Sequence, residues 1–448
     1  MTALTSPADR SGKRRGMLRF VFKSAPYSMM GNALPGIVNY VVILYLFAFN
    51  TAEDAGVFRI MTAVLGMFGV LSLFEMGTVY VQKVVARDTL AMIALFTARV
   101  VITLAGTLVF VLIHFAVFRD PSAISYFGLL GVFAALKFPG NLFVSVNQAL
   151  KRFRTSFWIN LAAYGGGFAA FVLAIRTTGD IEFATYIFVG LSSLVGFVAF
   201  FWVIREFGFV ANFGTAIRQF RLHDLRDAVM ASLSQLVPHS LLHVDKLILA
   251  QITGPAFVGL YSLGFSTGRL ILNLIKPGYY IFFSRFVEKL PTVRSLMLVI
   301  AFGTMSGLGI AAALYVAVFP LKLTPMPWEA FGVAMVILPS YGLALANSIY
   351  THAVILNRHA DTMHVLKANI WAALAVAGLF ALLPQVSPVM AIMIAAGWFP
   401  LRHLISFLYF LWVSPARDLG ADHPAPETMP QTVQGTAVDG KTLKGGAV

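Results

Sequence analysis

Ionisable side chains inside apolar segments are the residues of this chain best suited to chemistry. Eight cations lie within predicted membrane helices: Arg59, Arg99, Lys137, Lys246, Arg269, Lys276, Lys367 and Arg402. Only two acids, Glu75 and Asp245, clearly lie in the same segments. An ionised group inside a membrane helix costs about 2.5–3.5 kcal/mol on insertion scales. Because two acids cannot neutralise eight cations, the sequence predicts a water-filled cavity with a positive lining that attracts an anion.

Several of these residues also have a purely structural interpretation. Arg59 and Lys367 each lie one turn inside a predicted span, where a long side chain can reach the headgroup region. Lys246 can neutralise Asp245 or reach the outer surface. Glu75 and Asp245 can be sites of proton or cation coupling, or halves of structural ion pairs. Both interpretations stay open at this stage.

Metal, cofactor and enzyme chemistry have weak support. His239 and His243 share one helix face beside Asp245, but no third ligand accompanies them, which favours a polar lining over a metal site. A proton-linked role for these histidines stays open. The chain has no cysteine and no GxxxxGK[ST] phosphate loop. We therefore expect no metal, no cofactor and no enzymatic activity.

The composition is that of an integral membrane protein. Hydrophobic residues make up 58% of the 448 residues and charged residues 12%, whereas a soluble domain has roughly 25% charged residues. A net charge of +14 is compatible with a nucleic-acid partner. However, the cations lie in short loops between apolar segments, where membrane topology places them. We therefore expect a lipid environment and no nucleic-acid partner.

Twelve apolar segments are long enough to cross the bilayer, since about 20 helical residues span its ~30 Å core. They lack the alternation of a membrane β-barrel, so the sequence predicts an all-α membrane protein of about twelve transmembrane helices. The segments are about 24–49, 56–80, 89–118, 122–147, 156–175, 183–204, 227–251, 256–284, 295–319, 328–356, 363–383 and 388–412.

Charge in the connections predicts the orientation. We number the connections between the predicted segments from the N-terminus. The two termini and the even-numbered connections hold 22 Lys and Arg residues, and the odd-numbered connections hold three. Cytoplasmic loops carry the excess of cations, so both termini are expected in the cytoplasm. The membrane expected to hold the chain is the bacterial inner membrane. Trp158, Trp202, Trp328 and Trp412 lie near predicted helix ends, as interfacial anchors do.

The predicted organisation has two halves. Residues 1–23 form a basic cytoplasmic N-terminus; the apolar run after them is too long for a signal peptide. Residues 24–204 and 227–412 form six-helix lobes, joined by a basic cytoplasmic linker at 205–226. The tail, 413–448, is rich in Pro, Gly and Thr and is expected to be disordered.

The two halves open on the same pattern. At an offset of 203 residues, Pro35 matches Pro238, Gly56 matches Gly259, and Phe58 matches Tyr261. Each set describes a hairpin with a mid-span proline, a short turn and Gly-x-aromatic at the start of the return helix. Internal repeats of this kind are typical of transporters.

Prolines and glycines inside the spans predict kinked helices. Pro139 and Pro339 form a further candidate pair at similar places in the two halves. Broken helices at matching places indicate a central transport path. The positions concerned are Pro35, Pro139, Pro238, Pro277, Pro339, Pro400 and Gly165 to Gly167.

Short motifs in both halves resemble bacterial polysaccharide flippases. In the first half these are Ala55-Gly56-Val57-Phe58, Phe74-Glu75-Met76-Gly77-Thr78 and Val85-Ala86-Arg87. In the second they are Val244-Asp245-Lys246-Leu247-Ile248-Leu249 and Val258-Gly259-Leu260-Tyr261. The resemblance is to the O-antigen and exopolysaccharide (Wzx-type) branch of the multidrug/oligosaccharidyl-lipid/polysaccharide (MOP) exporter superfamily. It implies a V-shaped, MATE-like bundle of two six-helix lobes.

The resemblance also implies a function and partners. Such proteins move undecaprenyl-pyrophosphate-linked oligosaccharides to the periplasmic leaflet for O-antigen, capsule or exopolysaccharide synthesis. A pyrophosphate head suits a cationic cavity through charge-assisted contacts. A polysaccharide polymerase and a chain-length regulator stay open as partners.

Three alternatives remain open. A MATE-type multidrug exporter moves mainly cationic compounds, for which an acidic cavity is better suited. A polytopic polysaccharide polymerase or ligase normally needs a sizeable outer loop, and the longest predicted outer gap is about eight residues. A peptidoglycan-precursor flippase typically has two extra helices.

Overall fold

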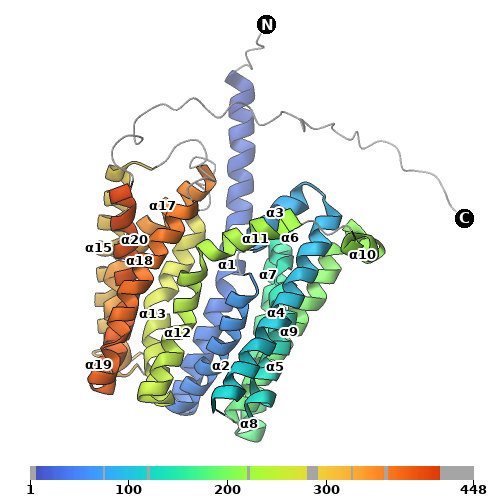
Figure 1. Cartoon of the computed structure of the whole chain (residues 1–448). Helices are drawn as coiled ribbons and strands as arrows, with labels where there is room; N and C mark the ends of the chain where they lie inside the picture. The colour runs from blue at the N-terminus through green and yellow to red at the C-terminus, as the bar shows by residue number, and fades with distance from the viewer. Residues whose placement is uncertain are drawn as a thin grey trace, which may run out of the picture.

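A computed structural model describes residues 7–73, 76–118, 122–218, 222–279, 291–323, 326–357 and 362–413. Every regular element within these ranges is a helix, and the helices stand side by side as a bundle (Figure 1). Glu75, Arg119 and residues 414–448 of the predicted tail lie outside the described residues, as does the side chain of Lys276.

The first half contains the helices that begin at α1. Their bounds are α1 Pro7–Phe49, α2 Ala52–Leu71, α3 Met76–Val85, α4 Thr89–Phe118, α5 Ser122–Gly140, α6 Leu142–Ala149, α7 Phe153–Asn160, η1 Leu161–Gly165, α8 Gly166–Thr178 and α9 Ile181–Ile204.

The second half follows a short helical connection. The connection contains η2 Arg205–Phe207 and α10 Phe209–Arg218. The helices after it are α11 Leu222–Ser234, α12 Leu236–Thr253, α13 Pro255–Tyr279, α15 Val293–Val318, α16 Trp328–Ile337, η4 Leu338–Ser340, α17 Tyr341–Asn357, α18 Thr362–Phe380, η6 Leu383–Gln385, α19 Pro388–Ala396 and α20 Trp398–Val413.

Nine stretches of the described chain are long and apolar enough to cross a membrane. The apolar end of α1, Ala33–Phe49, is a shorter one, and α12 and α13 carry charged side chains. All twelve predicted segments lie mainly on helices. The all-α membrane fold predicted from the sequence is therefore confirmed.

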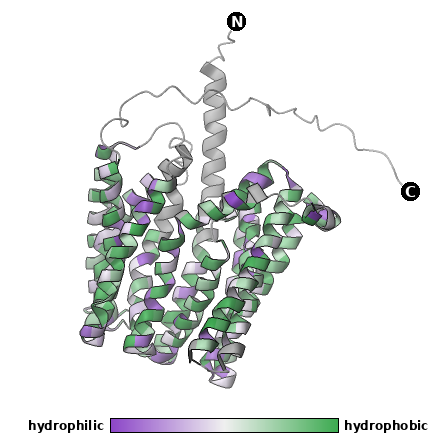
Figure 2. Ribbon diagram, viewed as in Figure 1, coloured by the Kyte–Doolittle hydropathy of each residue, from purple (hydrophilic) through white to green (hydrophobic). Residues whose placement is uncertain are grey.

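The outermost helices expose their apolar side chains. Only 28% of the apolar window of α4 and 22% of that of α15 is buried, against 61% in the span formed by α16 and α17. Figure 2 shows apolar residues along the sides of the bundle and polar ones mainly toward its ends. Such a band of exposed apolar surface is what contact with lipid requires.

Two spans are interrupted where the sequence predicts a pair of kinks. α5 ends at Gly140, directly after Pro139, and α6 starts again at Leu142. Pro339 lies in the 3₁₀ turn η4 between α16 and α17. Proline removes a backbone donor and clashes with the preceding turn, which explains both breaks. The glycine run at Gly165 ends a π-helical turn, another common cause of kinks.

The structure shows helices in two segments that the sequence assigns only as a basic terminus and a linker. α1 begins at Pro7, well before position 24, and extends beyond the neighbouring helices (Figure 1). The predicted linker 205–226 is helical for most of its length, since it holds η2, α10 and the start of α11. On α10, Phe209 and Ala216 are buried and Phe213 and Ile217 are exposed. A short amphipathic helix of this kind is not evident from charge distribution alone.

The halves meet along α1 and α2 of the first and α12 and α13 of the second. Figure 1 shows these helices at the centre of the bundle, with α4, α5 and α9 on one side and α15, α18 and α20 on the other. Two apolar cores support the bundle: one lies around Phe58 and Phe188 and also includes Leu263 and Phe331 of the second half, and the other lies around Tyr261 and Trp398.

Candidate functional site

Asp245 of α12 is the centre of a buried polar network. Lys246 Nζ donates to its Oδ1 and Oδ2 atoms at 2.9 and 3.1 Å. The hydroxyl of Tyr261 donates a short hydrogen bond to Oδ2. The indole N–H of Trp398 lies 3.1 Å from Oδ2 and 3.0 Å from the Tyr261 hydroxyl. The carboxylate is therefore occupied by donors from three helices, α12, α13 and α20.

Lys246 is held as firmly as its partner. Its Nζ atom also donates to the carbonyl oxygen of Leu242 at 2.7 Å. The ammonium lies 5.5 Å from the ring centroid of Tyr261 and 5.1 Å from that of Phe265, both cation–π distances. Asp245 is fully buried and Lys246 is 1% exposed. The two charges neutralise each other inside the protein.

Local structure explains how the network is assembled. Tyr261 and Phe265 are four residues apart on α13, so they share one face of that helix. Trp398 is the first residue of α20, after the break at Gly397 that ends α19. Its indole stacks on the ring of Phe265 at a centroid distance of 5.6 Å. The break therefore lets one aromatic residue reach both α12 and α13.

Two arginines lie near this neutral pair and a third lies near one of them; we call the three the arginine cluster: Arg59 of α2, Arg269 of α13 and Arg402 of α20. Arg59 and Arg269 interact electrostatically with each other and with Asp245. Arg402 interacts with Arg269. Because Lys246 already neutralises Asp245, the cluster keeps an excess of positive charge.

The arginine cluster is partly immobilised but not saturated. Arg269 Cζ lies 5.3 Å from the ring centroid of Phe265 and 5.4 Å from that of Phe399. The buried Nε atom of each arginine has no hydrogen-bond partner among the described residues. A buried donor without an acceptor is costly, so an anion with several acceptor oxygens is a suitable ligand here.

The other predicted cations lie elsewhere. Arg99 is buried on α4. Lys137, on α5, lies 5.6 Å from the ring centroid of Tyr164. Lys367, on α18, is exposed. The structure thus brings Arg59, Lys246, Arg269 and Arg402 together and leaves these three residues outside that group.

His243 lies between the two halves. A methyl group at Gly66 of α2 would overlap the imidazole ring of His243, so the ring occupies space that only a glycine leaves. His243 interacts electrostatically with Lys246, Arg59 and His239. Within the described part of the chain, no three His, Asp or Glu residues are grouped as metal ligands. The site therefore spans the α2–α12 contact.

The two repeated glycines meet at the interface of the halves. A methyl group at Gly56 would overlap the carbonyl oxygen of Pro255, and one at Gly259 would overlap that of Ala52. Pro255 follows Ala52 by 203 residues, as Gly259 follows Gly56. The contact is reciprocal, like that of a two-fold dimer. The hydroxyls of Thr267 and Tyr40 add a hydrogen bond of 3.1 Å between the halves.

Sequence reasoning missed the aromatic part of the site. Trp398 lies 153 residues from Asp245 and no local motif connects them. The sequence pattern marks Tyr261 only as a repeat position and as part of the flippase-like motif at Val258, and not as a partner of Asp245. One signal in the sequence could have found it. An indole N–H inside a membrane helix needs a hydrogen-bond acceptor, and Asp245 is one of only two acids predicted inside the spans.

Comparison with known proteins identifies the fold. No family model matches the chain, and no curated protein matches it. An outward-facing multidrug resistance MATE family transporter of the MOP superfamily covers 88% of this chain and 94% of its own, with a TM-score of 0.55 and 14% identity.

Two further solved structures agree. The inward-facing form of a multidrug resistance MATE family transporter of the MOP superfamily gives a TM-score of 0.53 over 86% of this chain and 93% of its own, at 14% identity. A point mutant of the Vibrio cholerae MATE transporter VcmN gives a TM-score of 0.51 over 89% of this chain and 97% of its own, at 12% identity. The chain therefore has the MATE-like fold of two helical lobes that its sequence predicts.

Proposed function

We propose that the chain is a lipid-linked oligosaccharide flippase. It moves undecaprenyl-pyrophosphate-linked repeat units across the inner membrane, from the cytoplasmic to the periplasmic leaflet, for O-antigen, capsule or exopolysaccharide synthesis. Two features support this function: a fold shared with transporters, and segments such as those at Gly56 and Asp245 that resemble polysaccharide flippases.

The observation that carries the proposal is the arginine cluster. Arg59 of α2 and Arg269 of α13 interact across the junction of the halves, and Arg402 of α20 interacts with Arg269. Guanidinium groups bind phosphate oxygens through paired, charge-assisted hydrogen bonds. A pyrophosphate headgroup supplies several such oxygens in one ligand. The sugar then follows the headgroup between the lobes, while the polyprenyl tail stays in lipid.

Asp245 has a structural role in this proposal. Its oxygens are occupied by Lys246, Tyr261 and Trp398. A group fixed in this way anchors α12, α13 and α20 so that the arginines hold their places.

A multidrug exporter is the second candidate, favoured by the multidrug transporters that share the fold. An exporter of organic cations needs an accessible carboxylate. Asp245 is buried and occupied, and the arginine cluster around it repels cations. These features favour an anionic substrate.

An enzyme of the same pathway is less suitable. Two of the described connections at the predicted outer side are very short: one residue separates α12 from α13, and two residues separate α8 from α9. A polymerase or ligase normally needs a larger outer loop for its site.

Complementation of a strain that lacks the gene tests the function. We expect Arg59→Gln, Arg269→Gln and Arg402→Gln to restore little surface polysaccharide and to leave lipid-linked repeat units on the cytoplasmic leaflet. Lys367→Gln, an exposed cation outside the cluster, serves as the matched control and should restore it fully. Membrane abundance is measured in parallel. Full export by the triple variant at normal abundance would show that the cluster does not bind the substrate.

A further inference from the structure

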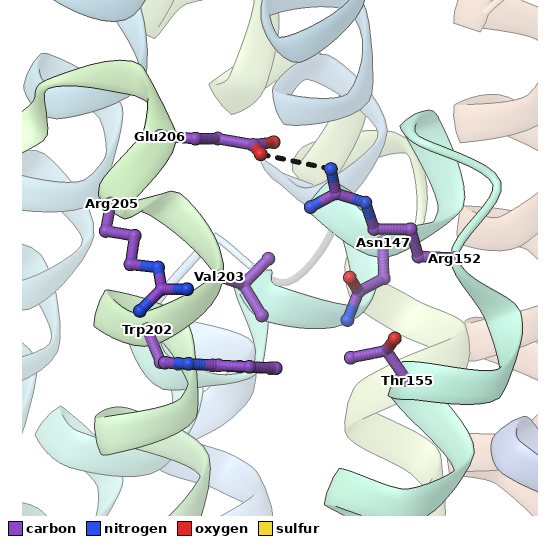
Figure 3. A pocket seen from close by; sticks show the side chains of 7 residues that line it. All are labelled: Asn147, Arg152, Thr155, Trp202, Val203, Arg205 and Glu206. Atoms are coloured by element: carbon purple, nitrogen blue, oxygen red, sulfur yellow. Dashed lines mark hydrogen bonds and ion pairs between the residues drawn. The ribbon is translucent and has the colours of Figure 1, made fainter. Parts of the chain in front are cut away.

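A polar cavity lies apart from the arginine cluster, between the first half of the chain and the helical connection that follows it. It has a volume of about 260 Å³ and opens between α6, α7 and the end of α9 (Figure 3). This end of the bundle, toward which α1 extends (Figure 1), is predicted to be cytoplasmic. The lining residues are Asn147, Arg152, Thr155, Trp202, Val203, Arg205 and Glu206.

The cavity carries one excess positive charge. Arg152 and Glu206 form an ion pair at 3.0 Å across the mouth (Figure 3), and both side chains remain exposed. Arg205 lies 5.7 Å from the ring centroid of Trp202. Two cations and one carboxylate leave a charge of +1, which a ligand with one negative charge balances.

Asn147 supplies a specific contact on the inner wall. Its side chain is fully buried. The amide Nδ2 lies 3.5 Å from Ser156 Oγ, a long hydrogen bond. Its Oδ1 atom has no hydrogen-bond partner among the described residues. Nearly all buried polar atoms have a partner, so Oδ1 needs a donor, and a hydroxyl group of a ligand is a suitable one.

An exposed apolar track on α9 ends at the cavity, and we call it the track. Leu194, Val198 and Trp202 follow one another at intervals of four residues on α9, so they share one face of the helix. They are 50%, 60% and 51% exposed. Tryptophan is typical of the headgroup level of a membrane. The track therefore offers lipid contact along the membrane and ends at the cationic cavity.

We propose that this cavity binds the headgroup of an anionic phospholipid that carries hydroxyl groups, with phosphatidylglycerol as the matching chemistry. The phosphodiester contacts Arg205 and Arg152, a glycerol hydroxyl donates to Asn147 Oδ1, and the acyl chains lie along the track. Basic pockets on the cytoplasmic side of membrane proteins bind anionic headgroups in this way. This lipid site is separate from the proposed transport function.

Native mass spectrometry of the purified full chain tests the site with four probes. These are phosphatidylglycerol, phosphatidylmethanol, phosphatidylcholine and free glycerol phosphate. Phosphatidylmethanol keeps the phosphodiester charge but has no headgroup hydroxyl. We expect phosphatidylglycerol to bind most tightly, phosphatidylmethanol less tightly and phosphatidylcholine least, with no displacement by an equal concentration of glycerol phosphate.

A matched pair of variants locates the binding. Arg205→Gln should weaken phosphatidylglycerol binding about fivefold, because one cation near a membrane contributes about 1 kcal/mol. Arg218→Gln removes an exposed cation of α10 that does not line the cavity, and should leave binding unchanged. Equal effects of the two variants would overturn the site.

Three ligand results would also overturn parts of the proposal. Equal binding of phosphatidylcholine would contradict recognition of the charge. Equal binding of phosphatidylmethanol would contradict the role of Asn147. Displacement by glycerol phosphate at equal concentration would replace the lipid by a soluble phosphate as the ligand.

Discussion

At the scale of single residues, the intramembrane charges divide into two kinds. Asp245 and Lys246 neutralise each other within a closed network. The arginine cluster has buried donors left over. The sequence predicted a surplus of cations and even the Asp245–Lys246 pairing as one alternative. It could not separate paired from unpaired cations, because that depends on Tyr261 and Trp398, which reach Asp245 from distant parts of the chain.

The buried ion pair should depend on both partners. Lys246→Met leaves the Asp245 carboxylate buried without its cation, and loss of one partner of a buried pair costs about 3–5 kcal/mol. The double variant Asp245→Asn/Lys246→Met removes both charges and should be less destabilised than the single one. The free energy of unfolding in mixed micelles measures this. A double variant as unstable as the sum of the two single variants would contradict the pairing.

The indole N–H of Trp398 should contribute to stability apart from its ring. Trp398→Phe keeps an aromatic ring beside Phe265 but removes the donor to Asp245. Hydrogen bonds to charged groups contribute about 1.5–3 kcal/mol, so a loss of that size is expected in the same unfolding assay. Trp412→Phe, at a position 77% exposed, is the control and should change little. Equal effects would mean that only aromatic bulk matters.

At the scale of elements, the internal repeat explains how the halves meet. Position matching at an offset of 203 residues predicted equivalent hairpins, and the structure brings Gly56 and Gly259 into reciprocal contact. Pro139 and Pro339 both interrupt their spans, as the sequence led us to expect. What the sequence could not give is the contact itself, since hydrophobic patterns fix the helices but not which faces pack together. The amphipathic helix α10 was missed because the linker was interpreted from its charges and not from its apolar period.

The repeated glycines should tolerate no added methyl group. Gly56→Ala or Gly259→Ala would force a side chain against a carbonyl oxygen of the opposite half, and overpacking typically costs about 1–3 kcal/mol. We expect lower stability and reduced export in both variants. Gly309→Ala on α15, where nothing lies within 4 Å of the added group, is the matched control. Two variants as stable and active as this control would contradict the close contact.

At the scale of the whole molecule, composition and charge predicted the class of fold correctly, because a membrane imposes length, polarity and helical backbone on every span. The sequence also supplied most members of the site, since charges are conspicuous in apolar segments. It did not show which of them meet, because Arg59, Arg269 and Arg402 come together only when α2, α13 and α20 pack around the same pair. That arrangement is set by tertiary contacts.

The orientation in the membrane can be tested by labelling single introduced cysteines, because the chain has no cysteine of its own that would react. The variant Lys322→Cys, between α15 and α16, should react with a membrane-impermeant maleimide in intact spheroplasts. The variant Lys151→Cys, between α6 and α7, should react only after the membrane is permeabilised. The excess of cations on the Lys151 side is the physical reason. The reverse labelling pattern would place both predicted termini outside the cytoplasm.

Flipping in proteoliposomes tests whether the arginine cluster binds a pyrophosphate-linked sugar and carries it across the membrane. The purified chain is reconstituted with a fluorescent polyprenyl-pyrophosphate oligosaccharide, and an impermeant quencher reports the leaflet. We predict flipping by the wild-type chain, a loss of about tenfold or more for each Arg→Gln variant of the cluster, since charge-assisted hydrogen bonds contribute about 1.5–3 kcal/mol, and no movement of the same sugar on an uncharged polyprenol. Equal flipping of the two lipids, or wild-type rates when Arg59, Arg269 and Arg402 are all replaced by Gln, would contradict transport through the arginine cluster.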